Sequence, residues 1–190
     1  MKMFNKFAFA AVFTSLALGV SAQDDDDDAH NVVISIPEVA LVDIEGTGGN
    51  SITLGPTAPT EAGDPLDFSG QTNSDLWVNY SSIKHSVDDP TRTIAAKISN
   101  GTMPAGMSLS VTAGADAGNG DGATGSSAGA VTLTTSDQSV ITGIGSAYTD
   151  DGVSNGHNLT YTLAVASGSY ANLDAASGAT VEITYTISDN

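Results

Sequence analysis

The stretch "ATVEITYTISDN", residues 179–190, alternates apolar and polar side chains without a break. Its apolar positions are Val181, Ile183, Tyr185 and Ile187. Strict alternation over this length is typical of a strand with one buried face and one solvated face. The intervening threonines fit the same interpretation, because a branched Cβ packs well on a pleated surface. The segment therefore predicts an amphipathic β-strand.

The same period of two recurs through most of the chain. Further alternating runs are "NVVISIP" (31–37), "EVALVDIE" (38–45), "LWVNYSSI" (76–83), "RTIAAKI" (92–98), "GMSLSVTA" (106–113), "AVTLTT" (130–135), "SVITGI" (139–144) and "NLTYTLAVA" (158–166). Turn-forming Gly, Pro, Asn and Asp clusters separate these runs. We predict an all-β fold, a single antiparallel β-sandwich that is Ig-like or jelly-roll-like, with nine or ten strands and little helix. We expect "SVDDPTR" (86–92) to be a hairpin connection between 76–83 and 92–98.

The first 22 residues have the three parts of a secretory signal. Lys2 and Lys6 precede the apolar run "FAFAAVFTSLALGV" (7–20), and small residues follow at a cleavage point before Gln23. The alternative is a retained N-terminal anchor. We expect export to the extracellular space or the outer cell surface, with the periplasm as an alternative. No second apolar stretch follows, so we expect no membrane insertion of the mature chain.

The expected organisation is therefore a signal peptide (1–22), a flexible acidic leader (23–30) and a β-sandwich domain (31–190). Removal of the signal leaves three basic residues against 22 acidic ones, a balance of −19. Five of the acidic residues form the run Asp24–Asp28, whose mutual repulsion favours a solvated segment. A surface of this sign repels phosphate, which excludes nucleic acid as a partner. The chain contains no cysteine, so disulfides do not stabilise it.

A glycine-rich segment, "DAGNGDG" (116–122), offers oxygen ligands for a cation. Asp116, Asn119 and Asp121 provide the side-chain oxygens that Ca²⁺ prefers. The spacing differs from that of an EF-hand loop, and no glutamate follows at the required distance. The alternative is a tight turn, since Asn, Asp and Gly favour turns. Ca²⁺ is the single cofactor that we consider, and we predict none with certainty.

Motifs for catalysis are missing from the sequence. There is no nucleophile elbow, zinc-binding histidine pair, phosphate-binding loop or dinucleotide fingerprint. His30, His85 and His157 are all expected in loops. We do not expect an enzyme. Trp77, the single tryptophan, is either a platform for stacking on a sugar or part of the core.

Several phrases resemble a known group of proteins. "HNVVISIPEVALVDI" (30–44), "DLWVNYSSI" (75–83), "TMPAGMSLSVTA" (102–113) and the terminal "VEITYTISDN" (181–190) look like uncharacterised exported β-sandwich proteins of Gram-negative bacteria. The "PAGMSLSV" phrase (104–111) and the terminal strand are also distantly similar to fimbrial and pilus subunits, although the usual cysteine pair of those subunits is absent. Such subunits often complete a neighbour's sheet with an N-terminal segment.

The resemblance and the residues together favour a secreted or cell-surface structural protein, a filament, fimbria-like or adhesive-matrix subunit. Its assembly strand would lie within about residues 31–45, with Val32, Ile34 and Ile36 on one face. The partners would be copies of itself or other surface proteins. It is equally open that this segment pairs within its own domain, in which case the aspartates discourage edge-to-edge aggregation. The alternative function is a calcium-stabilised carbohydrate-binding module that binds glycans through Trp77, without catalytic activity.

Overall fold

A computed structural model describes residues 27–85, 90–175 and 179–190 of the protein. The chain divides by internal contacts into residues 1–35 and a second unit, Ile36–Asn190. Within the first unit, residues 27–35 form no regular element and are exposed. All the strands of the described residues belong to the second unit. The first strand begins at Val39.

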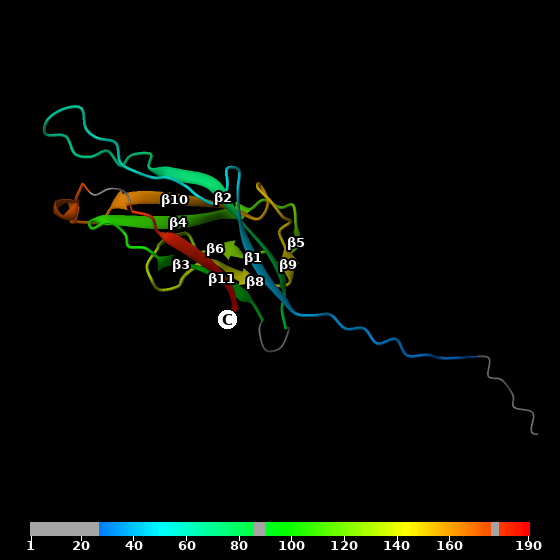
Figure 1. The fold of residues 1–190 in the computed structure, drawn as a ribbon. Coiled ribbons are helices and arrows are strands. Elements are labelled where there is room, and N and C mark those ends of the chain that lie inside the picture. Colours follow the sequence, from blue (N-terminus) through cyan, green and yellow to red (C-terminus); the bar gives the residue numbers. More distant parts are fainter. Residues whose placement is uncertain (1–26, 86–89, 176–178) are drawn as a thin grey trace, which may run out of the picture. The chain divides into compact units, whose positions relative to one another are not determined.

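The second unit consists of two antiparallel sheets packed face to face (Figure 1). The larger sheet contains β1 (Val39–Gly46), β2 (Thr72–Ile83), β4 (Met107–Asp116), β5 (Asp121–Gly122), β7 (Ala130–Thr132), β9 (Ala147–Tyr148) and β10 (His157–Val165). The smaller sheet contains β3 (Arg92–Asn100), β6 (Ser126–Ser127), β8 (Gln138–Ile144) and β11 (Glu182–Asp189). Helical structure in the described residues is limited to one 3₁₀ turn, Tyr170–Asn172. The predicted all-β sandwich is confirmed. The described residues form eleven strands, and the three that the sequence did not predict, β5, β6 and β9, contain two residues each.

The order of the strands places the first and last strands at sheet edges. In the larger sheet β1 pairs with β2, which is followed by β10, β4 and β7. In the smaller sheet the order is β11, β3, β8 and β6. Strands β1 and β11 lie side by side although they belong to different sheets. We call this side of the sandwich the β1–β11 seam.

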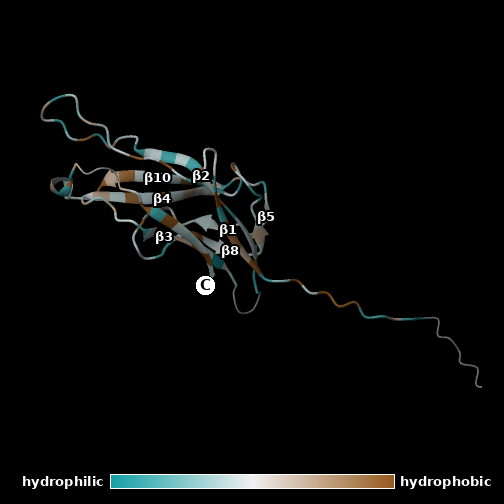
Figure 2. Cartoon of the chain, viewed as in Figure 1, coloured by the Kyte–Doolittle hydropathy of each residue, from teal (hydrophilic) through white to brown (hydrophobic). Residues whose placement is uncertain are grey.

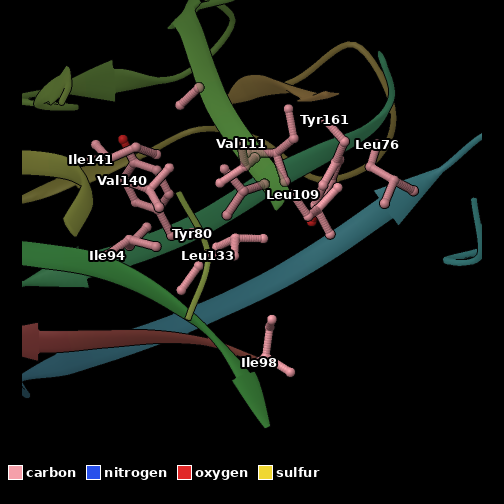
Figure 3. Packing of buried hydrophobic residues seen from close by; sticks show 14 of the residues in the cluster. Leu76, Tyr80, Ile94, Ile98, Leu109, Val111, Leu133, Val140, Ile141 and Tyr161 are labelled. Carbon is pink, nitrogen blue, oxygen red and sulfur yellow. The ribbon is translucent and has the colours of Figure 1, made fainter. Parts of the chain in front are cut away.

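The core lies between the two sheets and is built by the predicted alternation (Figure 3). From β2, Leu76, Val78 and Tyr80 point inward, and each is at most 4% exposed. Matching inward residues come from the other long strands: Ile94, Ile98, Leu109, Val111, Val140, Ile141, Leu159 and Tyr161. Because side chains of a strand point to opposite faces in turn, the residues between them point away from this core. Asn79 is one of these, but it is buried and bonds to the main chain of Gly152 and Asn155.

Two local expectations were wrong. Residues 31–36 form no strand, so the first strand begins at Val39 rather than at the "NVVISIP" run. Strands β2 and β3 lie in different sheets, so their connection crosses the sandwich and is not a hairpin. Asp88 and Asp89 of this connection lie outside the described residues, as do residues 1–26 with the predicted signal. Alternation predicts which face of a strand is buried, but it does not determine which strands become neighbours.

Candidate functional site

The most exposed large apolar side chains of the described residues lie in the segment before β1. Val32, Val33, Ile34 and Ile36 are 70%, 93%, 82% and 76% exposed. Figure 2 colours this segment as a hydrophobic stretch outside the strands. Full burial of an aliphatic side chain contributes about 1.5–3 kcal/mol, so several such groups in water favour association with another surface. The three residues predicted for an assembly strand are thus exposed and belong to no strand.

The β1–β11 seam has a second set of incompletely buried apolar groups. Val42 and Ile44 from β1, and Ile183 and Ile187 from β11, pack against the core but keep part of their surface in solvent. This contrasts with Ile94 and Ile141 of the inner strands, which are fully buried. Edge strands have a neighbour on one side only, which explains the difference.

A tyrosine pair connects the two sheets between β10 and β11. The hydroxyl groups of Tyr161 in β10 and Tyr185 in β11 are 2.8 Å apart and share a hydrogen bond. Burial raises the pKa of both phenols above the ordinary value for tyrosine. The pair therefore stays protonated in the folded protein at neutral pH and satisfies two polar atoms that would otherwise be buried without partners.

A buried arginine closes one end of the seam. The Arg92 side chain is 1% exposed, and its Nε donates to Asp189 Oδ1 at 2.6 Å. Its other nitrogens donate to the carboxylate of Glu38 and to the main-chain oxygen of Val39. At 3.3 Å, Nη1 also reaches the Ile83 oxygen. This "Arg92 clasp" joins the beginning of β1, the end of β2 and the end of β11. No local sequence signal predicts it, because its partners are between 9 and 97 residues away.

An acidic trio lies on β1 and the loop after β9. Carboxylate oxygens of Asp43, Glu45 and Asp151 lie within 4.8 Å of one another. Asp43 and Glu45 occupy the same face of β1 because they are two positions apart. Among the described residues, this is the group of three acidic or histidine side chains close enough together to share a cation. Three negative charges at this separation repel each other in solution.

The predicted calcium ligands lie at the end of β4 and the start of β5. The Asp116 Oδ2 atom accepts from the Gly118 N–H at 3.2 Å, and Asp121 Oδ1 accepts from the Gly122 N–H at 2.7 Å. Asn119 donates its amide to Asn155 Oδ1 at 2.7 Å. The Asp116 bond is that of an Asx turn, the Asp121 bond joins adjacent residues, and the Asn119 bond is a loop-to-loop contact. They neither form nor exclude a calcium site, and calcium binding stays a prediction.

One histidine was placed wrongly by the sequence. His157 is the first residue of β10 rather than part of a loop, and it is 1% exposed. Its Nδ1 lies 2.9 Å from the Gly114 oxygen, and its Nε2 lies 2.9 Å from the Tyr80 hydroxyl. Burial, with a smaller contribution from the Asp116 charge, raises the pKa of Tyr80. The alternation Leu159, Tyr161 and Leu163 extends back to His157 and was the signal that could have located it.

Trp77 lies on the side of β2 opposite the core. Its neighbours along the strand, Leu76 and Val78, point inward, whereas Trp77 is only partly buried. Its cross-strand neighbours are Glu45 in β1 and Asn158 in β10. The indole therefore belongs to the outer face of the larger sheet.

No helix of the described residues is long and apolar enough to span a membrane. The described residues contain an exposed apolar segment, two neighbouring edge strands and an arginine that anchors the start of β1. No family model, curated protein or solved structure matches this chain.

Proposed function

We propose that the protein is an exported, self-assembling structural subunit of the cell surface or extracellular space. In this proposal, residues 31–37 of one copy add as a strand to the sandwich of another. The observation that supports it is the exposure of Val32, Ile34 and Ile36 in a segment that forms no strand. Resemblance to exported β-sandwich proteins and, distantly, to fimbrial and pilus subunits is consistent with this function.

The physical basis is β-strand addition. An extended segment gains main-chain hydrogen bonds from an open sheet edge, and its alternate side chains gain apolar contacts. Residues 31–37 carry no charge, so nothing in the segment opposes burial. Pro37 marks its end, because proline cannot donate a ladder hydrogen bond. The acidic leader before the segment keeps unassembled copies apart by charge repulsion.

The strongly negative charge of the protein makes assembly depend on salt concentration. Copies that carry a balance of −19 repel each other at low ionic strength, and added salt screens this repulsion over about 10 Å at 0.1 M. Assembly is therefore expected to increase with salt concentration. An assembly that weakened with salt would instead indicate attraction between opposite charges.

The test compares two substitutions in the exported protein. Ile34→Asp places a charge on the face that would be buried, and Val33→Asp places the same charge on the opposite face. Light scattering and electron micrographs over a concentration series should show polymers for the wild type and for Val33→Asp, but monomers for Ile34→Asp. A wild type that stays monomeric at all concentrations and salt levels would contradict the proposed function. Equal effects of the two substitutions would contradict the role of the segment.

A second candidate function rests on the outward position of Trp77. An indole on the outer face of a sheet provides a platform for stacking on a sugar ring, and calcium at Asp116, Asn119 and Asp121 would stabilise this module. Glycan binding that disappears in Trp77→Ala would support it. A melting temperature that calcium does not raise relative to chelator would rule out calcium stabilisation, since binding to the folded state must raise it.

A further inference from the structure

We infer that the acceptor for the donated segment is the outer edge of β11, and that the donor comes from a second copy and runs antiparallel to β11. This inference rests on the proposed function and adds the edge, the direction and the register.

The other edges of the described residues are short or protected. Strands β5, β6 and β7 contain two or three residues each and provide too few main-chain groups. Strand β1 is long enough, but Asp43 and Glu45 place charge along it. The Asp43 carboxylate also accepts the main-chain N–H of Ile44 at 2.8 Å. Charged residues of this kind are how sheet edges resist pairing.

Strand β11 lacks such protection. Between its terminal residues Glu182 and Asp189 it carries only isoleucine, tyrosine, threonine and serine. It pairs with β3 on one side, and no strand of the described residues pairs with its other side. An unpaired edge of this length with high β-propensity is a template for another strand.

The hydrogen-bonding phase of β11 indicates which of its groups are available. The Asn190 N–H donates to the Thr91 oxygen at 3.2 Å, on the β3 side. Hydrogen-bonded positions recur at every second residue of an antiparallel ladder. The main-chain groups of Ile183, Tyr185 and Ile187 therefore face away from β3, toward the side of β11 with which no strand of the described residues pairs.

One antiparallel register matches both chains. It places Ile34 opposite Tyr185, and consequently Ile36 opposite Ile183 and Val32 opposite Ile187. Residues directly opposite each other point to the same face of a sheet. The three donor side chains then extend the half-buried apolar row of β11.

The same register places Val33 opposite Thr186 on the outer face, and Pro37 opposite Glu182 at the end of the ladder. Thr186 is exposed, so nothing of the described chain covers this position. The N–H that proline lacks falls where the ladder ends, and the pairing therefore loses little. A shift by one residue would turn Val32, Ile34 and Ile36 toward solvent.

The connection to β1 favours donation to another copy over insertion into the same one. The Arg92 clasp holds Glu38 and Val39 beside Asp189, so β1 begins where β11 ends. A segment that folded back from Pro37 along β11 would run parallel to it. Parallel pairing is slightly less stable per residue and normally requires a crossover connection. A second copy has no such restriction on direction.

Cysteine cross-linking in the exported protein tests the register, since the natural chain has no cysteine. Opposed Cα atoms in antiparallel sheets are about 4.5–5.5 Å apart, within the range for a disulfide. Under mild oxidation, the double variant Val33→Cys/Thr186→Cys should give a reducible ladder of covalent multimers. The matched control Val33→Cys/Leu41→Cys probes the edge of β1, where Leu41 is 65% exposed, and should give none.

The outcomes separate the inference from the proposed function. Covalent multimers from Val33→Cys/Leu41→Cys but not from Val33→Cys/Thr186→Cys would move the acceptor to β1. A disulfide between Cys side chains of the same chain in Val33→Cys/Thr186→Cys would show that the segment inserts into its own sandwich. No ladder from either pair, while the wild type still polymerises, would overturn the β11 edge and leave the proposed function standing.

A second measurement does not depend on oxidation. Combined with Val33→Asp, Thr186→Lys places opposite charges at facing positions of the outer face, and Thr186→Asp places like charges there, without removal of a core side chain. The like-charged pair should raise the concentration needed for assembly by about two- to fivefold relative to the opposite-charged pair, whereas Leu41→Lys and Leu41→Asp, each combined with Val33→Asp, should give equal concentrations. Equal concentrations for the two Thr186 pairs would overturn the assignment.

Discussion

Replacement of Arg92 by alanine tests the clasp that holds the start of β1 to the rest of the sandwich. The substitution removes a cation that is 1% exposed and leaves the carboxylates of Glu38 and Asp189 without it. It also removes the donor from the main-chain oxygens of Val39 and Ile83. These partners belong to three strand ends, so the substitution loosens β1 first.

The expected loss follows from the burial of each partner. Removal of one member of a fully buried ion pair costs about 3–5 kcal/mol, because the remaining charge is left without water. Here Glu38 and Asp189 are 50% and 46% exposed, so both carboxylates can be hydrated again once Arg92 is absent. The hydrogen bonds to the main-chain oxygens of Val39 and Ile83 are not recovered, and each loss costs about 1 kcal/mol. We expect a free energy of unfolding lower by about 2–3 kcal/mol and a melting temperature lower by roughly 5–10 °C.

Urea unfolding followed by the fluorescence of Trp77, the single tryptophan, measures this loss. The protein should be dilute, so that assembly does not contribute. A change of midpoint without a change of slope would identify a loss of stability rather than of compactness. Amide hydrogen exchange adds a local readout, since exchange at Val39 and Leu41 should accelerate more than exchange in β10.

Lys97→Ala is the matched control. Lys97 lies on the same strand as Arg92 and forms an ion pair with Asp137 at 3.2 Å, but these side chains are 35% and 53% exposed. Such surface pairs contribute about 0.2–1 kcal/mol. If Arg92→Ala cost no more than Lys97→Ala, the clasp would not stabilise the fold and the reasoning would be wrong.

Three further results are expected. Burial raises the pKa of Tyr80, Tyr161 and Tyr185, so these phenols ionise more readily in the unfolded chain. The free energy of unfolding should be constant up to about pH 10 and then fall by as much as roughly 4 kcal/mol per pH unit. Urea unfolding between pH 7 and 11.5 measures this fall. A stability that did not change across pH 10–11.5 would show that these phenols are accessible. Asp151→Asn relieves repulsion in the acidic trio and should raise the melting temperature in chelator by roughly one or two degrees relative to the wild type. If the variant melted below the wild type in calcium, that result would indicate that the trio holds the cation. Gly156→Ala should destabilise the fold by more than about 1 kcal/mol in urea, because Gly156 has φ +63° and an added Cβ would lie 2.2 Å from the Val78 oxygen; an unchanged midpoint would contradict that packing.

Period-two alternation was a sufficient signal for the class of fold. Residues 107–113, 159–165 and 182–189 were predicted as strands and are strands, since side-chain alternation is a local property of the pleat. The same rule also predicted a strand at residues 31–36, where the structure has none. Alternation shows that a segment is able to pair, but pairing also requires a neighbour that only the assembled fold provides.

The sequence alone therefore determined the all-β class, the buried face of most strands and the negative charge of the protein. Tertiary structure decided that β2 and β3 lie in different sheets, that β1 and β11 become neighbouring edges, and that Arg92 is buried among partners from distant parts of the chain. It also moved His157 from an expected loop into the core. The physical reason is that strand propensity and periodicity act over a few residues, whereas edge position and burial depend on contacts between segments far apart in the chain.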